Sequence, residues 1–153
     1  MLQIPRFMPA LSKQGLEDFL SKGNIAKIAT IDENGSPYIT PVWYEWDGKS
    51  LYIIARDKSK YLANVRKNSN IAICIDISTA PYTRVTAQGK ARILSNFDWV
   101  PMGKRMTVRY LGESGLAYLD ETLNRERTVI RIDPTSLQSW SGAEWHPRYI
   151  NTS

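Results

Sequence analysis

The alternation of apolar and polar side chains along the chain predicts a protein built mainly from β-strands. From residue 84 to 94, Val, Ala, Gly, Ala and Ile occupy one set of alternate positions, and Arg, Thr, Gln, Lys and Arg occupy the other. This is the pattern of a long strand with one buried face. Isoleucines at 71, 73, 75 and 77 indicate a second strand, and residues 25–31 indicate a third that is apolar on both faces and therefore central. Further strands are expected at 37–45, 51–55, 128–132 and 137–140.

Turn residues between these runs predict hairpin connections. Asp32-Glu33-Asn34-Gly35 and Trp46-Asp47-Gly48-Lys49 each separate two β-rich runs, and Asp-Gly is a strong hairpin signal. Pro41 lacks a backbone donor, so its strand is expected at a sheet edge or with a bulge. Asp133-Pro134 is interpreted as the end of the strand 128–132.

Three segments have the apolar spacing of helices. Ser12 is a suitable cap for a helix over 13–22 that stops at Gly23, and Ser59 for a helix over 60–67. A helical region over 98–123 is expected in two pieces, broken at Gly112-Glu113-Ser114-Gly115. Together these elements predict a mainly β fold, a six- to seven-stranded antiparallel β-barrel with peripheral helices. No linker or internal repeat divides the chain, so one domain over 1–153 is expected.

Composition narrows the class of protein. The 153 residues are 42% hydrophobic and 23% charged, as in an ordinary soluble globular domain. No apolar run approaches the ~18–20 residues of a membrane-spanning helix, and the first residues lack the pattern of a signal peptide. The single cysteine, Cys74, cannot form an intrachain disulfide, and it is predicted to be an inert packed thiol. A cytoplasmic location without membrane association is therefore expected.

The net charge of +5 arises from 20 Lys and Arg against 15 Asp and Glu. These cations are scattered except over 56–67, which favours a phosphate-bearing small ligand over nucleic acid. A nucleic-acid-binding barrel remains an alternative.

The segment Arg56-Asp57-Lys58-Ser59-Lys60 is the strongest candidate site. It places three cations on alternate residues where a strand meets a helix N-terminus, and free N–H groups with nearby cations bind anions. The strand Thr40-Pro41-Val42-Trp43-Tyr44 lies a hairpin's width away and offers apolar and aromatic surface. A ligand with a flat ring and a phosphate tail would suit both the cationic segment and the apolar surface of this strand.

The run PVWYEWDGKSLYIIARDKSKYLANVRKNSNIAICID resembles the flavin-binding split barrels of the pyridoxamine-5'-phosphate-oxidase-like group, especially their small branch that uses FMN or the deazaflavin F420. The resemblance implies an FMN-binding oxidoreductase that passes hydride between the flavin and a small organic substrate. It also implies a homodimer with the cofactor at the interface. An F420-dependent reductase and a non-enzymatic flavin carrier or redox sensor remain alternatives.

The same resemblance implies which residues bind the cofactor. Arg56, Lys58, Ser59 and Lys60 are expected at the phosphate. Arg84 and Trp140 are further candidates for contact with the cofactor or its pocket. The ring is expected to rest on six residues, namely Thr40, Pro41, Val42, Trp43, Ile54 and Ala55.

No catalytic side chain and no metal site are predicted. His146 is the only histidine and has no His/Cys cluster around it, and no phosphate loop or nucleophile motif occurs. Trp140, Trp145 and Tyr149 give the last fourteen residues three aromatic rings, so the tail is expected to dock at a dimer cleft and to bring His146 and Arg148 near the ring.

Overall fold

The computed structural model describes residues 10–142. These residues form seven strands, four α-helices and one 3-10 turn, which confirms the predicted mainly β class. In chain order the elements are α1 (Lys13–Leu20), β1 (Ala26–Ile31), β2 (Pro37–Val42), β3 (Glu45–Trp46), β4 (Leu51–Arg56), α2 (Lys60–Lys67), β5 (Asn70–Asp76), β6 (Tyr82–Leu94), α3 (Val100–Leu111), η1 (Glu113–Gly115), α4 (Leu116–Asp120) and β7 (Arg127–Gly142).

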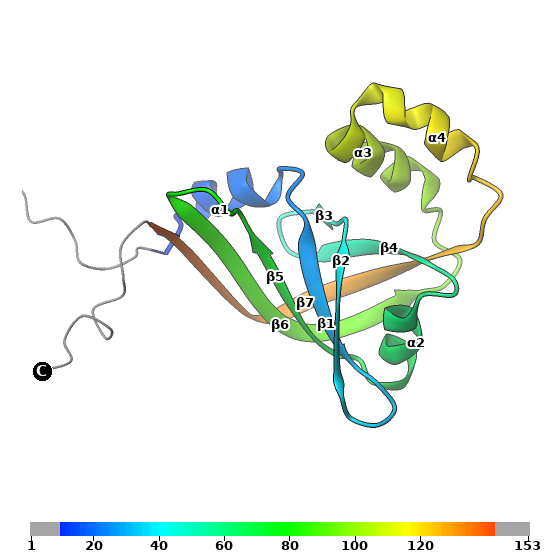
Figure 1. Cartoon of the computed structure of the whole chain (residues 1–153), viewed down its shortest axis with the longest axis horizontal. Coiled ribbons are helices and arrows are strands. Elements are labelled where there is room, and N and C mark those ends of the chain that lie inside the picture. Colours follow the sequence, from blue (N-terminus) through cyan, green and yellow to red (C-terminus); the bar gives the residue numbers. More distant parts are fainter. Residues whose placement is uncertain (1–9, 143–153) are drawn as a thin grey trace, which may run out of the picture.

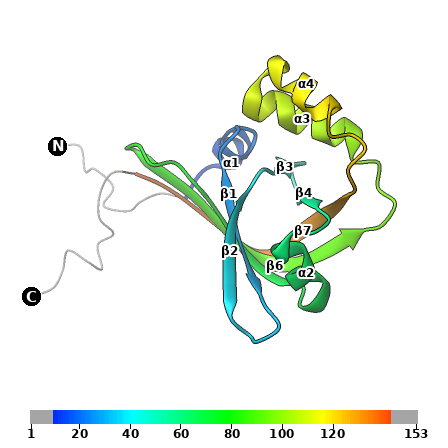
Figure 2. The ribbon, with the colours of Figure 1, turned by 45° about the vertical axis from the view of Figure 1, so that its right-hand side comes forward.

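One antiparallel sheet contains all seven strands, in the order β2-β1-β5-β6-β7-β4-β3. Its two edge strands, β2 and β3, are consecutive in the chain, and only Trp43 and Tyr44 lie between them. Because so short a link must join opposite edges, the sheet has to curl, and Figures 1 and 2 show it rolled into a half-barrel. Pro41 lies in the edge strand β2, as predicted, while the break in the strand falls two residues later.

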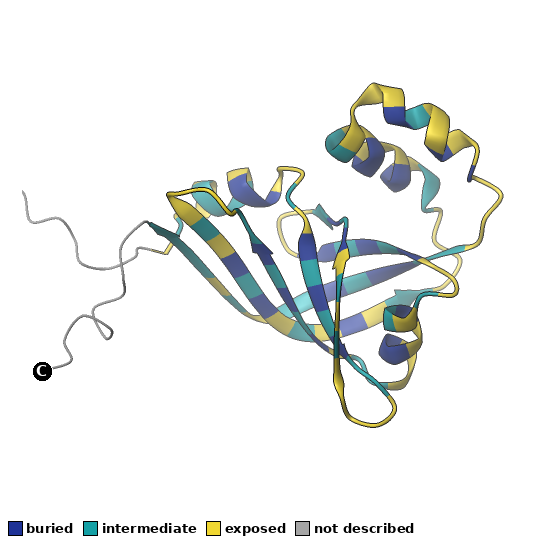
Figure 3. Cartoon of the chain, viewed as in Figure 1, coloured by how far each residue is buried: buried dark blue, intermediate teal, exposed yellow. Residues whose placement is uncertain are grey.

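The inner face of the curled sheet carries the core. Isoleucines of β5 and the apolar residues of β6 face inward, as their alternation predicts, and Figure 3 shows buried and accessible residues alternating along these strands. The helices α1 and α2 add apolar side chains to the same core, namely Phe19, Leu20, Leu62 and Val65. β1 lies between β2 and β5, so it is a central strand rather than an edge strand, as predicted.

β7 differs from the sequence expectation. Asp133-Pro134 does not end the strand, and residues 127–142 form one strand, of which residues 129–142 run alongside β6. The pairing shifts register at Gln88 and Gly89, which leaves Thr135 as an extra residue. A bulge tolerates proline because one ladder hydrogen bond is already missing there. The predicted separate strand 137–140 is therefore the second half of β7.

Gly89 allows the backbones of β6 and β7 to approach closely at the bulge. A Cβ atom at residue 89 would lie 2.5 Å from the carbonyl oxygen of Asp133. Beyond the bulge, β7 no longer pairs with β4. There β6 and β7 extend together, with β5 still paired to β6 as far as Arg84, as an arm directed away from α3 and α4 (Figure 1).

The helices also depart from prediction in detail. The Ser12 hydroxyl accepts a hydrogen bond from the Gly15 amide (3.0 Å) and begins α1 as expected, but the helix ends at Leu20. Ser59 precedes α2 without capping it, because its hydroxyl donates instead to the Arg56 carbonyl (2.7 Å). The break at Gly112 is as predicted, and α4 ends at Asp120. No helix within residues 10–142 is both long and apolar enough to span a membrane.

Candidate functional site

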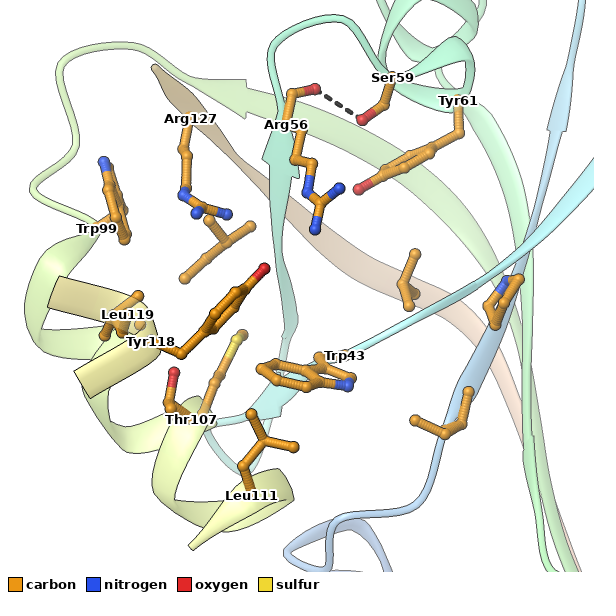
Figure 4. A pocket seen from close by; sticks show the side chains of 16 residues that line it. Trp43, Arg56, Ser59, Tyr61, Trp99, Thr107, Leu111, Tyr118, Leu119 and Arg127 are labelled. Carbon is orange, nitrogen blue, oxygen red and sulfur yellow. Dashed lines mark hydrogen bonds between the residues drawn. The ribbon is translucent and has the colours of Figure 1, made fainter. Parts of the chain in front are cut away.

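A cavity of about 660 Å³ lies on the outer side of the half-barrel. Strands β2, β4 and β7 form one side of it, and the pair α3–α4 forms the other (Figure 4). The site therefore lies outside the barrel core, between the sheet and the helices that follow β6.

Strand alternation explains the apolar floor. In β4, Leu51, Ile53 and Ala55 point into the core, so Ile54 and Arg56 point outward into the cavity. Ile54 belongs to a second apolar cluster on this outer face, formed by Met102, Met106 and Val129 with Trp43, Tyr52, Leu94 and Trp99. Both faces of β4 are thus covered, and the outer cover consists of α3.

Contacts from α3 fix Trp43 in the cavity wall. The Trp43 ring stacks on Tyr110, with 4.8 Å between ring centroids and 1° between their planes. The Tyr110 hydroxyl donates to the Asn24 carbonyl (2.9 Å) and accepts from the Tyr44 amide (3.2 Å). Since Trp43 and Tyr44 form the link between the sheet edges, these bonds hold α3 against that link.

Glu45 strengthens the attachment of α3. Arg105 donates two hydrogen bonds to its carboxylate, at 2.8 and 2.9 Å, and Arg109 donates one at 3.2 Å. Arg109 also donates to the Tyr44 carbonyl (2.7 Å). Partial burial raises the pKa of Glu45, but the two guanidinium groups outweigh this effect, so that its pKa lies below the ordinary value.

Two arginines face the cavity from adjacent strands. Arg56 and Arg127 are direct partners in the β4–β7 pairing, and both line the cavity. Like charges directly opposite each other across a pair of strands are destabilising. Neither guanidinium forms an ion pair with a carboxylate in the described part of the chain. The cavity therefore carries a concentrated positive charge.

The surroundings of the two guanidiniums differ. Arg127 lies over the Trp99 ring (5.0 Å to its centroid) and donates one hydrogen bond to the Thr122 hydroxyl (2.9 Å), while its Nε is buried without a partner. Burial, followed by the charge of Arg56, lowers the pKa of Arg127. Arg56 lies instead near Ser59 and Tyr61, and Figure 4 shows the Tyr118 hydroxyl directed into the space between the two arginines.

Half of the residues predicted to bind a cofactor line this cavity, namely Pro41, Val42, Trp43, Ile54, Arg56 and Ser59. Ala55 points into the barrel core, and Thr40 is half-buried on β2 outside the cavity lining. Lys58 and Lys60 are exposed on the α2 side, where the Lys60 ammonium lies 4.9 Å from the centre of the Tyr38 ring.

Arg84 and Trp140 lie together, but far along the β6–β7 arm. They are direct partners in the strand pairing, and the Arg84 guanidinium lies 5.2 Å from the Trp140 ring centre. Neither residue lines the cavity. A second groove of about 380 Å³ runs over β1, β5, β6 and β7 and includes Cys74. Burial raises the pKa of the Cys74 thiol, and Asp76 adds to this effect.

Sequence reasoning missed Arg127 and the helical side of the cavity. Arg127 directly precedes the predicted strand 128–132 and belongs to no motif, and only the register of β4 and β7 places it opposite Arg56. Within residues 10–142 there is no group of acidic, His or Cys side chains that could hold a metal ion. Trp145, His146, Arg148 and Tyr149, which were predicted to dock near the ring, lie outside the described residues.

Comparison with known proteins identifies the class. Residues 12–141 match the family model described as pyridoxamine 5'-phosphate oxidase, and the chain belongs to that family. The resemblance inferred from the sequence is thus confirmed. No curated protein gave a significant match.

Solved structures support the assignment of the fold. A conserved hypothetical protein from Mycobacterium tuberculosis is 23% identical with a TM-score of 0.73, over 94% of this chain and 90% of that chain. An F420 reductase is 19% identical with a TM-score of 0.59, over 79% and 94%. A putative pyridoxamine 5'-phosphate oxidase from Listeria innocua is 13% identical with a TM-score of 0.65, over 83% and 96%. At these identities the likeness concerns the fold.

Proposed function

We propose that this protein binds a flavin-type cofactor, FMN or F420, in the cavity between β4 and α3 and acts as an oxidoreductase on a small organic substrate. The observation that carries the proposal is the combination, in one cavity, of an aromatic and apolar wall with two arginines that lack carboxylate partners in the described chain. Membership of the pyridoxamine 5'-phosphate oxidase family supports it.

The residues present fit such a cofactor. A cavity of about 660 Å³ is within the usual range of roughly 300–1,000 Å³ for ligand sites. Trp43 and Ile54 offer a flat apolar surface for a ring system, and Arg56 offers donors for a phosphate at the start of α2. The Ser59 hydroxyl would have to rotate away from the Arg56 carbonyl, to which it donates, before it could donate to the same phosphate. When bound, the cofactor would supply the hydride chemistry, and the protein would supply orientation and binding.

Each part of the chain has a definite task in this proposal. Arg56 and Ser59 hold the phosphate, and the exposed Lys58 and Lys60 raise the positive potential around it. Trp43, held by Tyr110, keeps the ring oriented against β4. Met106 and Leu119 keep water away from the opposite side of the cavity.

A specific observation favours F420 as the alternative cofactor. Beyond Lys58 and Lys60, α2 ends with the exposed cations Arg66 and Lys67, of which Lys67 pairs with Glu33 (2.9 Å). A longer acidic tail could follow this basic surface away from the cavity, whereas FMN ends at its phosphate. A flavin carrier or redox sensor would need the same cofactor-binding residues but no room for a substrate.

We also propose that the protein is a cytoplasmic homodimer. Ile39 on the edge strand β2 is 66% exposed, and it borders the second groove. Arg84 and Trp140 lie on the β6–β7 arm and do not line the cavity of their own chain, so a two-fold partner could receive them beside its cofactor.

Spectroscopy of the purified full chain tests the cofactor. An oxidised flavin has two visible and near-ultraviolet bands, whereas F420 has one. Titration of cofactor-free protein with FMN and with F420, followed by fluorescence, would give both affinities. Arg56→Gln should weaken binding, and Lys13→Gln, which removes an exposed cation from α1, should leave it unchanged. Failure of both cofactors to bind at micromolar concentration would contradict the proposal, and salt-sensitive binding of nucleic acid would support the alternative barrel function.

A further inference from the structure

We propose that the part of the cavity under α3 and α4 is a substrate subsite for an organic carboxylate with an apolar body, and that Arg127 binds the carboxylate. This inference rests on the proposed function, in which the cofactor lies against β2 and β4. It concerns the side of the cavity that the cofactor would leave open.

Arg56 and Arg127 mark two separate anion positions. Figure 4 shows Arg56 grouped with Ser59 and Tyr61, whereas Arg127 lies beside Trp99. A phosphate at Arg56 and Ser59 would satisfy the first group. The second guanidinium would still lack an acidic partner within residues 10–142.

The environment of Arg127 calls for an anion of its own. The side chain is half-buried, its Nε has no hydrogen-bond partner, and the charge of Arg56 opposes it from the neighbouring strand. A buried cation with unsatisfied donors is costly unless an acceptor reaches it. A ligand carboxylate bound to the free Nη groups would neutralise the guanidinium charge and offset the repulsion from Arg56.

Three N–H groups of Arg127 remain free, which is enough for the two oxygens of a singly charged carboxylate but few for the three oxygens of a phosphate dianion. One Nη2 hydrogen is engaged with Thr122, and Nε is enclosed by protein. The remaining N–H groups can form the paired bonds that arginine makes with a carboxylate. The Tyr118 hydroxyl, directed between the arginines, adds one more donor (Figure 4).

The side chains around Arg127 are apolar and therefore favour a carboxylate whose remaining part is apolar. Met106 and Leu119 are buried side chains of α3 and α4, and Leu111 stands at the open side with 48% of its surface exposed. The Trp99 ring lies under the guanidinium and lines the same cavity. An aromatic or branched aliphatic acid would bury its body here, whereas a sugar would leave its hydroxyl groups without partners.

Calorimetry with a matched pair of probes tests the assignment. Benzoate and benzamide have nearly the same shape, and only benzoate is charged. We expect cofactor-loaded protein to bind benzoate about tenfold more tightly than benzamide, or better, as for a charge-assisted bond. Arg127→Gln should abolish this preference while the affinity for the cofactor, measured separately by fluorescence titration, stays within about twofold. Arg127→Lys should restore part of the preference, since it keeps the charge.

Arg125→Gln is the matched control, because it removes an exposed arginine two residues away that does not line the cavity. It should leave the preference for benzoate intact. Equal binding of the two probes by the loaded protein, or a preference that survives Arg127→Gln, would overturn the inference and leave the cofactor proposal standing. A large loss of cofactor affinity in Arg127→Gln would also overturn it, by assigning Arg127 to the cofactor. If the unaltered protein bound neither FMN nor F420, the proposed function itself would fail.

Discussion

The facing arginines lead to a prediction in which stability and binding change in opposite directions. Arg56 and Arg127 are direct partners across β4 and β7. Residues so placed have Cβ atoms about 4.5–5.5 Å apart, and opposite pairs contribute roughly 0.2–1 kcal/mol in either direction. Arg56 is exposed, so solvent screens the repulsion, and about 0.5–1 kcal/mol is a reasonable estimate for it.

Arg56→Gln removes this repulsion and keeps a polar side chain. In the cofactor-free protein, the free energy of unfolding should therefore rise by about 0.5–1 kcal/mol, which corresponds to an increase in Tm of about 1–4 °C for a domain of this size. The same change removes a charge-assisted contact to the phosphate, worth about 1.5–3 kcal/mol, so cofactor affinity should fall about 10- to 150-fold.

Thermal unfolding followed by circular dichroism and fluorescence titration measure the two effects on one preparation. Arg131→Gln is the control for a β7 arginine, since Arg131 pairs with Asp133 (2.9 Å) and does not line the cavity. This control should not raise Tm. A drop in the Tm of cofactor-free Arg56→Gln, together with unchanged cofactor affinity, would refute the reasoning on both counts.

The remaining predictions concern α3, the bulge and the dimer. Glu45→Gln should lower the free energy of unfolding at pH 7 by about 1–2 kcal/mol, because Arg105 and Arg109 lose their carboxylate partner. Since the folded-state pKa of Glu45 is depressed, this contribution is present above its unfolded pKa of about 4.3 and lost as the pH falls through the folded value. Urea titrations should thus show the difference between the two proteins shrinking below about pH 4; a difference independent of pH would contradict the role of the carboxylate. Gly89→Ala should destabilise the protein by about 1–3 kcal/mol in chemical denaturation, because the new Cβ would meet the Asp133 carbonyl oxygen at 2.5 Å; unchanged stability would mean that the strands separate there easily. Ile39→Glu should convert a dimer to a monomer in light scattering, since it puts a charge on an exposed apolar edge residue; a dimer of unchanged stability would place the interface elsewhere.

Local patterns predicted the elements of the fold well. The isoleucine alternation of β5 and the Asp-Gly turn before β4 depend on neighbours in the chain, so the sequence contains all the information they need. The error at Asp133-Pro134 has a different origin. Whether a proline ends a strand depends on whether the partner strand can accommodate a bulge, and this was decided by Gly89, more than forty residues earlier.

The candidate site was predicted only in part, because some of its residues are neighbours in the sequence and others come from distant segments. Arg56, Ser59 and Ile54 belong to a contiguous motif, so their position in one common site could be inferred from the sequence. Arg127 and Trp99 come from segments that are far away in the chain, and only the order of the strands brings them beside β4. The direction of Lys60 toward Tyr38 likewise depends on the packing of α2 beside β2.

The two-residue link between the edges of the sheet has a consequence for folding. Trp43 and Tyr44 can occupy their positions only when β2 and β3 have reached opposite edges of the same curled sheet, a late and non-local event. The same two residues provide the stacking surface and the backbone partners that hold α3. Closure of the sheet and completion of the cavity are therefore one cooperative step. A ligand in the cavity should slow amide hydrogen exchange in β2, β3 and α3 together, because these segments can open only as a unit.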